Sequence, residues 1–364
     1  MKKVNLYTPI NSLGYGVVGY NVWKKLREKA DVTLWAIQNE QQIAPPVQVS
    51  EEVINKIRED VDKQNDFHNS TCLKIWHENQ LAHRIGSGKF VAMPFFEVSK
   101  LNHRRLSHLK SADEIIVTSS WARDVLLNQK NSNQTAWQSP YIHVIPCGVD
   151  REIFNENGCD NFPVEKCIFF NCGKWEIRKG HDVLYKAFNA AFDSHAKVEL
   201  WMMNENPFLS PEETNSWHKL YRNPKIKMLD RVQYQHELAD IMKQTYCGVF
   251  PARAEGWNLE ALEMMATGKH LIITDYSAHT EFCNEKNSRL IDITQEEPMY
   301  DGKWFLGDNG NWASLEGDAF DQLVNHMREV YESWRTERTV NENGIQTSKE
   351  LSWERCATKI SEVL

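Results

Sequence analysis

Short apolar runs of strand length alternate with helix-like segments along almost the whole of this 364-residue chain, and this alternation limits the fold more than any other feature. The strand-like runs of the first part are KKVNLY (2–7), DVTLWAI (31–37), KIW (74–76), KFVAMPF (89–95), EIIVTS (114–119) and PYIHVIPCGVD (140–150). Strands that alternate with helices form a parallel sheet covered by helices. The sequence therefore predicts an α/β fold.

The pattern restarts after a polar stretch at 151–164 that is rich in Asn, Gly, Pro and acidic residues. Later strand-like runs are CIFFNCG (167–173), KVELWMMN (197–204), IKML (226–229), YCGVFPA (246–252) and HLIITDY (270–276), and the helical ones between them are HDVLYKAFNAAF (181–192) and HELADIMKQT (236–245). From about residue 317 onward, Leu323, Met327, Val330 and Tyr331 have helical spacing. We predict a first domain at 1–150, a linker at 151–164 and a second doubly wound domain at 165–349, facing each other across a central cleft.

Composition narrows the function classes. With 50 acidic and 42 basic residues the net charge is −8, which disfavours general nucleic-acid binding. The sequence shows no signal peptide, no apolar run of the roughly 20 residues that a membrane span needs, and eight cysteines without a CxxC pair. We expect a cytoplasmic protein with free thiols and no metal motif. The basic segment 102–110 is interpreted as a solvated helix face, with a membrane or acceptor patch as the alternative.

Two glutamates in the stretch 252–273 raise a specific question. Pro251 ends a strand and Asn258 can cap a helix, so Glu255 falls in the turn and Glu263 in the second helical turn. A helix N-terminus at the carboxyl end of a strand favours an anion such as phosphate, and Gly256 lets backbone approach it. The alternative is an amphipathic helix with acidic residues on its exposed face. A glycoside hydrolase pair is disfavoured, because two carboxylates eight positions apart on one helix lie about 12 Å from each other.

The segment GYGVVG (14–19) is predicted to form a loop after a strand and before a helix around NVWKKLREKA (21–30), and it matches the GxGxxG fingerprint of dinucleotide-binding proteins. That site also needs an acidic residue at the end of the second strand, where Gln38 and Asn39 stand instead and Glu40 comes late. An NAD dehydrogenase is therefore disfavoured, and a plain tight turn is another alternative.

Five segments resemble, in the expected order, retaining glycosyltransferases of the GT-B fold, in particular family 4. They are VTSSWARDVL, VIPCGVDREIF, NCGKWEIRKGHDVLYKAF, EGWNLEALE and TDYSAHTEF. EGWNLEALE resembles the family's E-x7-E motif, and the stretch with Lys174 and Lys179 resembles its basic GR(x)nKG segment. The resemblance implies two Rossmann-like domains, with the final helix at 350–364 packed back on the first one.

The resemblance also implies roles for single residues. Glu263 would bind the ribose hydroxyls of a nucleotide sugar, Glu255 the hydroxyls of the transferred sugar, and Lys174 and Lys179 the diphosphate. Lys174 stands where the family usually has arginine, and Arg178 would compensate for it. The donor-binding positions that the resemblance adds are Gly14, Gly16, Gly256, Trp257, Asn258 and Leu259.

On the acceptor side, the family's histidine after the fourth strand is missing, and Glu97 takes its place as a catalytic candidate. His77 and Glu78 follow a strand and are candidates for acceptor contacts, with a structural histidine as the alternative. The implied reaction moves a hexosyl group from a UDP- or GDP-sugar to a hydroxyl of a glycan, lipid or small molecule, with retention and without metal or cofactor. Peripheral association with the inner face of a membrane is compatible with it. A nucleotide-sugar epimerase and a non-catalytic nucleotide-sugar-binding protein remain alternatives.

Overall fold

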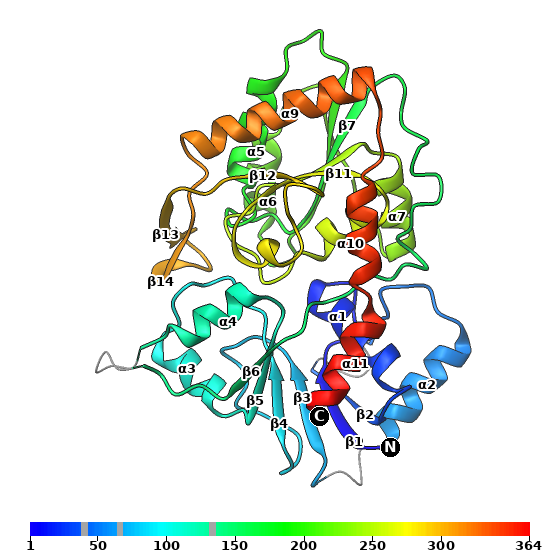
Figure 1. Cartoon of the computed structure of the whole chain (residues 1–364), viewed down its shortest axis with the longest axis vertical. Helices are drawn as coiled ribbons and strands as arrows, with labels where there is room; N and C mark the ends of the chain where they lie inside the picture. Colours follow the sequence, from blue (N-terminus) through cyan, green and yellow to red (C-terminus); the bar gives the residue numbers. More distant parts are fainter. Residues whose placement is uncertain (38–42, 64–67, 131–135) are drawn as a thin grey trace. The chain divides into compact units, whose positions relative to one another are not determined.

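Two parallel six-stranded sheets form the framework of the chain in this computed structural model, one in each of two compact units (Figure 1). The structure describes residues 1–37, 43–63, 68–130 and 136–364. The first unit comprises Met1–Asp150, Gln233–Gln235 and Leu351–Leu364, and the second comprises Arg151–Val232 and His236–Glu350. The predicted α/β class is confirmed. Gln38, Asn39 and Glu40, which bear on the dehydrogenase alternative, lie outside the described residues.

The first sheet has the strand order β2-β1-β3-β4-β5-β6. Its strands are β1 Lys3–Thr8, β2 Asp31–Ala36, β3 Thr71–Ile75, β4 Phe90–Met93, β5 Glu114–Val117 and β6 Tyr141–Val144. The helices of this unit are α1 Gly14–Leu26, α2 Glu51–Asp62, α3 His103–Lys110, α4 Ser120–Leu127 and α11 Trp353–Val363. Since β2 lies on one side of β1 and β3 on the other, the order reverses between β1 and β3. The carboxyl ends of strands at such a reversal are where α/β sheets bind ligands.

Helix α1 begins earlier than the sequence suggests, and this corrects the placement of the glycine segment. Gly14 is its first residue, so Gly14 and Gly16 lie in the first helical turn and not in a loop before the helix. A Cβ atom on Gly16 would stand 2.2 Å from Oδ1 of Asn11, and one on Gly19 would stand 2.1 Å from the carbonyl oxygen of Pro9. These two glycines therefore allow α1 to pack closely on the chain that leaves β1.

The C-terminal helix α11 belongs to the first unit, where it packs against α1 (Figure 1). Ser352, which caps the helix, forms a parallel bridge with Val149. Gly148 has no room for a side chain, since a Cβ atom would lie 2.1 Å from the backbone nitrogen of Trp353. The chain thus returns to the unit in which it began.

The second sheet has the order β12-β11-β10-β7-β8-β9, which reverses between β7 and β10. Its strands are β7 Cys167–Gly173, β8 Val198–Asn204, β9 Ile226–Met228, β10 Cys247–Phe250, β11 His270–Thr274 and β12 Arg289–Ile291. The helices are α5 His181–Ala191, α6 Pro211–Leu220, α7 Gln235–Lys243, α8 Leu259–Ala266, α9 Asp318–Thr336 and α10 Glu342–Glu350, with the short 3-10 helix η3 Ser277–Glu281. An antiparallel hairpin of β13 Glu296–Tyr300 and β14 Leu306–Ala313 was not predicted.

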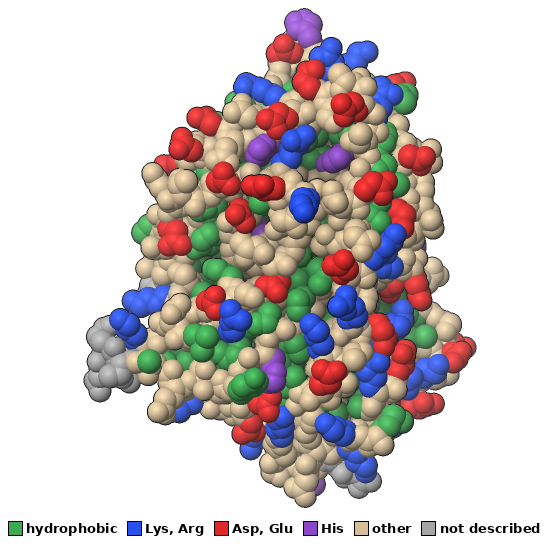
Figure 2. Space-filling view, viewed as in Figure 1, with side chains coloured by type: hydrophobic (Ala, Val, Ile, Leu, Met, Phe, Trp, Pro, Cys, Tyr) green, Lys and Arg blue, Asp and Glu red, His purple; other side chains and the backbone are tan. Residues whose placement is uncertain are grey.

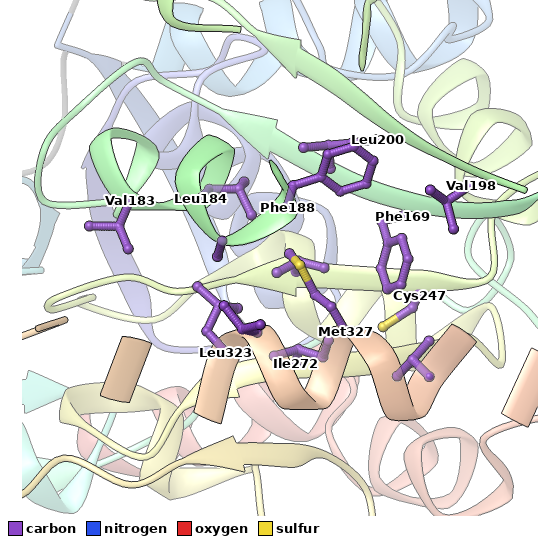
Figure 3. Packing of buried hydrophobic residues seen from close by; sticks show 14 of the residues in the cluster. Phe169, Val183, Leu184, Phe188, Val198, Leu200, Cys247, Ile272, Leu323 and Met327 are labelled. Carbon is purple, nitrogen blue, oxygen red and sulfur yellow. The ribbon is translucent and has the colours of Figure 1, made fainter. Parts of the chain in front are cut away.

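The core of the second unit lies between the sheet and the helices α5 and α9 (Figure 3). Phe188 of α5 and Met327 of α9 are almost completely buried among side chains of the strands, such as Phe169. Leu323 and Val330 of α9 are buried as well, which confirms the helical spacing seen in the sequence. Each such side chain contributes about 1.5–3 kcal/mol by its burial. This core holds the ends of β7 and β10 in place.

Acidic and basic side chains are interspersed over the face that Figure 2 shows. No helix in the described part of the chain combines the length and the apolar character that a membrane span requires. The eight cysteines carry free thiols, as predicted.

Candidate functional site

Two loops leave the neighbouring strands β7 and β10, between which the order of the second sheet reverses. Residues 174–180 connect β7 to α5, and residues 251–258 connect β10 to α8. Ligands of open α/β sheets bind at the carboxyl ends of strands at such a reversal. Most of the predicted donor-binding residues lie on these two loops.

Glu255 is the centre of a buried ionic cluster. Nζ of Lys179 donates to its Oε1 at 2.7 Å, and Nη1 of Arg178 lies 2.8 Å from its Oε2. Arg178 also donates to the carbonyl oxygen of Ala254 at 2.7 Å, and its Nη2 lies 2.7 Å from Oε2 of Glu176. The cluster therefore brings together Glu255, Lys179 and Arg178, which the sequence analysis placed in one donor site.

The charged groups in this cluster shift one another's pKa values. Burial alone would raise the pKa of Glu255, but Arg178 and Lys179 outweigh it and hold the pKa at about 2. Burial alone would lower the pKa of Lys179, but Glu255 and Glu260 reverse the effect and raise it. At neutral pH the carboxylate and the ammonium are both charged. Lys179 also runs past Gly173, where a Cβ atom would touch its side chain at 3.4 Å.

Glu255 is held by the backbone as well as by its side chain. Its N–H donates to Oγ of Ser277 at 2.8 Å, and the N–H of Ala278 donates to its carbonyl oxygen at 3.3 Å. Ser277 has a φ of 55°, a left-handed conformation that is uncommon for a residue other than glycine. The segment TDYSAHTEF, one of the five that carried the family resemblance, thus positions Glu255.

Asn258 caps α8, as predicted, and connects it to the same segment. Its side-chain oxygen accepts the N–H of Ala261 at 3.1 Å, and its Nδ2 lies 2.9 Å from Nε2 of His279. Nδ1 of His279 lies 3.1 Å from the carbonyl oxygen of Thr274. Burial lowers the pKa of His279 to about 4, so the ring is neutral: Nδ1 donates to Thr274, and Nε2 accepts from Asn258. The cap and the N-terminus of α8 are thereby fixed beside Glu255.

Glu263 lies in the second turn of α8 and is only 5% exposed. Burial raises the pKa of the Cys172 thiol, and the charges of Glu260 and Glu263 raise it further. The alternative of a solvent-facing acidic helix is therefore wrong for Glu263. Its predicted role toward ribose hydroxyls stays a prediction.

The other predicted donor residues have less direct support. The ammonium of Lys174 lies 5.0 Å from the centre of the Phe208 ring. Trp257 is buried and packs on Phe282 at 4.9 Å between ring centres, which is a structural contact. Gly256 is buried, and Leu259 is partly exposed at the first position of α8.

Arg253 is a positioning residue that sequence reasoning missed. Its guanidinium donates to both carboxylate oxygens of Asp182 at 2.7 and 2.9 Å and to Oε1 of Glu297 at 2.7 Å. It also donates to the carbonyl oxygen of Ile177 at 2.6 Å. Arg253 thus ties the two site loops to each other and to the β13–β14 hairpin. Its position two residues before Glu255, in a loop with few polar side chains, was the available signal.

The acceptor-side candidates of the first unit also come together. Tyr15 of α1 packs on His77 at 4.6 Å, on Trp76 at 5.1 Å and on Phe95 at 5.3 Å between ring centres. Its hydroxyl donates to the carbonyl oxygen of Phe95 at 3.0 Å. Of the two predicted glycines, Gly14 has open space where a side chain would lie, whereas Asn11 fills that space at Gly16.

Glu78 is buried, and its Oε1 lies 3.0 Å from Nε of Arg105 on α3. Burial raises the pKa of Glu78 to about 7; Arg105 opposes the rise, and Glu97 adds to it. Burial raises the pKa of Tyr15 too, and Glu78 and Glu97 contribute to that shift. Tyr15, Glu78 and Glu97 therefore form one electrostatic cluster.

Comparison with known proteins shows what this part of the chain is similar to. Residues 166–301 match the family model of glycosyl transferases group 1. The matched residues include both site loops, with Lys174, Lys179 and Glu255, and Glu263 of α8. The chain shares 23% identity over 257 residues with mannosylfructose-phosphate synthase of Agrobacterium fabrum. The match covers 64% of this chain and 55% of that protein, so the chain spans little more than half of this relative's length.

Solved structures show that the whole chain has the GT-B fold. Sucrose-phosphate synthase from Thermosynechococcus elongatus superposes with a TM-score of 0.69 at 14% identity, covering 100% of this chain and 98% of that one. HepE of Anabaena, in complex with UDP and glucose, superposes with a TM-score of 0.66 at 13% identity, covering 100% and 99%. The predicted GT-B architecture is confirmed.

Proposed function

We propose that this protein is a retaining glycosyltransferase that moves a hexosyl group from a UDP- or GDP-sugar to an acceptor hydroxyl. The observation that carries the proposal is the buried trio of Glu255, Arg178 and Lys179 at the reversal of the second sheet, beside the N-terminus of α8. The group 1 domain match supports it, and so does the likeness to a structure that contains UDP and glucose.

The trio suggests how donor binding proceeds. Without ligand, both oxygens of Glu255 are engaged by cations. A diphosphate supplies stronger acceptors for Arg178 and Lys179 and benefits from the positive end of α8. Glu255 is then released to accept hydrogen bonds from the hydroxyls of the sugar. Glu263, deeper in α8, accepts from the ribose.

Catalysis follows from this exchange of partners. Negative charge grows on the leaving diphosphate as the glycosidic bond breaks, and Lys179 and Arg178 meet it from fixed positions. Because these cations supply the neutralising charge, turnover should need no divalent metal or other cofactor. Full activity in EDTA is expected, and activity that is lost in EDTA and restored by Mn²⁺ or Mg²⁺ would contradict this part of the proposal.

Thermal unfolding in the presence of UDP-, GDP-, ADP- and CDP-sugars tests the donor. A ligand that binds only the folded state stabilises it by about 2.7 kcal/mol at a hundredfold excess over Kd. We expect a UDP- or GDP-sugar to raise the melting temperature and the others to have little effect. No shift with any nucleotide sugar would refute the assignment.

Analysis of the reaction products distinguishes the proposed glycosyltransferase from two rival functions. An epimerase would convert the sugar when it is incubated with donor alone, and sugar analysis would detect the conversion. A non-catalytic binder would bind the donor but would never release nucleotide when acceptors are offered. We expect nucleotide release that depends on an acceptor, without conversion of the free donor.

A further inference from the structure

A pocket of about 280 Å³ lies in the first unit, where the order of the first sheet reverses. Tyr7 and Lys74, which are register partners near the ends of β1 and β3, form one wall. The chain that follows β3 contributes Trp76, and α3 contributes Arg104 and His108. The pocket therefore occupies the position at which α/β sheets bind ligands.

The wall of this pocket is basic. Lys74, His83, Arg104 and His108 line it, and none of its ten described lining residues is acidic. Arg104 and His108 come from the segment 102–110, in which the sequence analysis saw either a solvated helix face or an acceptor patch. The chain has a net charge of −8, so this cluster of basic side chains differs from the average composition of the chain.

Lys74 is held rigidly and is 3% exposed. Its Nζ donates to the carbonyl oxygens of Gln80 and His83 at 2.7 Å each and lies 4.7 Å from the centre of the Tyr7 ring. Since an ammonium has three N–H donors, one is left for a ligand. Burial lowers the pKa of Lys74, so an anion in the pocket would stabilise its charged form.

His108 presents its other ring nitrogen as a donor. The N–H of Ala82 donates to Nδ1 at 3.1 Å, so the ring proton of neutral His108 lies on Nε2. Burial lowers the pKa of His108, and Arg104, Lys74 and His83 lower it further. Within the described part of the chain, no hydrogen bond or ion pair engages the guanidinium of Arg104. Basic groups that lie this close together would be stabilised by an anion between them.

We propose that this pocket binds the phosphoryl group of a small acceptor, such as a sugar phosphate. That the ligand is an acceptor rests on the proposed glycosyltransferase function. A phosphate dianion offers several oxygens to the Arg104 fork, His108 and Lys74 at once, which a neutral sugar does not. The aromatic faces of Tyr7 and Trp76 and the amides of Asn79 and Gln80 suit a polyhydroxy ligand. The volume, near the lower end for ligand pockets, favours a compact molecule over a long chain.

Calorimetry on the full chain tests the pocket with inorganic phosphate, a hexose 6-phosphate and the free hexose. We expect the hexose phosphate to bind at least tenfold more tightly than the hexose and to compete with inorganic phosphate. Arg104→Gln should weaken the hexose phosphate at least tenfold. Lys110→Gln is the matched control, because it removes one charge from the same helix at an exposed position outside the pocket and should change affinity less than twofold.

The outcomes separate the pocket from the proposed function. Equal binding of hexose and hexose phosphate, or unchanged binding in Arg104→Gln, would overturn the inference. The inference would also be overturned if hexose phosphate does not bind and the protein instead binds phosphatidylglycerol vesicles in a way that Arg104→Gln abolishes. Donor binding is measured separately: a nucleotide sugar that is turned over only with unphosphorylated acceptors refutes the pocket and leaves the glycosyltransferase standing. If hexose phosphate binds but no nucleotide sugar does, the pocket stands and the glycosyltransferase function is refuted.

Discussion

Glu255 in the second unit and Glu78 in the first are each 5% exposed, yet their pKa values move in opposite directions. Two cations share Glu255 and hold its pKa at about 2, although burial opposes this. Burial raises the pKa of Glu78 to about 7, since Arg105 and a backbone hydrogen bond oppose it only in part and the charge of Glu97 adds to it. Equal burial therefore leaves one carboxylate charged at all physiological pH values and the other poised between its two forms.

The difference matches the two tasks that the proposed function requires. A diphosphate site needs cations that are already charged and aimed, and Glu255 keeps Arg178 and Lys179 in that state. A carboxyl group with a pKa near 7 can gain or lose a proton during a reaction at neutral pH. Under the proposed function, the cluster of Tyr15, Glu78 and Glu97 is therefore suited to exchange a proton with an acceptor hydroxyl.

Removing one cation should make Glu255 resemble Glu78. In Lys179→Ala, Arg178 would be the main group left to oppose the effect of burial on the pKa of Glu255, and the leaving diphosphate would lose a stabilising charge. We expect kcat to fall by roughly 10² to 10³, the usual effect of losing one such group. Initial rates of nucleotide release with purified, folded protein measure the effect.

Lys186→Ala serves as the control for that variant, because Lys186 is exposed on α5 and lies outside the site. It should retain the wild-type rate. A Lys179→Ala enzyme within twofold of wild type would show that the ionic cluster only stabilises the fold.

Glu263 sharpens the comparison within the second unit, because its predicted partners change little during the reaction. Glu263→Gln keeps the size of the side chain but weakens hydrogen bonds from ribose hydroxyls. KM for the donor should rise about tenfold, with a smaller change in kcat. The exposed Glu285 provides the control Glu285→Gln. A loss of kcat at unchanged KM would contradict ribose binding and indicate a role in the chemical step.

The sequence predicted the site in the second unit, around Glu255, better than the cluster in the first unit, around Glu78. Glu255, Asn258 and Glu263 follow one strand within a single loop and helix, so local rules of strand ends and helix caps place them. Arg253 was missed because its partners, Asp182 and Glu297, are far away in the sequence. The start of α1 was misplaced because glycines read as a turn, whereas Gly16 and Gly19 are required by close packing inside a helix. The pKa of Glu78 depends on Arg105 and Glu97, which no local pattern connects to it.

The smallest expected effect concerns the stability of the first unit. The pKa of Glu78 is raised on folding, so between about pH 4.5 and 7 the folded state keeps a proton that the unfolded state has released. The free energy of unfolding should therefore fall as pH rises through this window, by at most about 1.4 kcal/mol per pH unit.

Glu78→Gln cannot ionise, so it should match wild type near pH 4.5 and become relatively more stable toward pH 7. Urea unfolding across this range measures the difference, with the exposed Glu59→Gln as the control that should follow wild type. Parallel pH profiles for wild type and Glu78→Gln would mean that Arg105 keeps Glu78 charged, and the contrast with Glu255 would disappear.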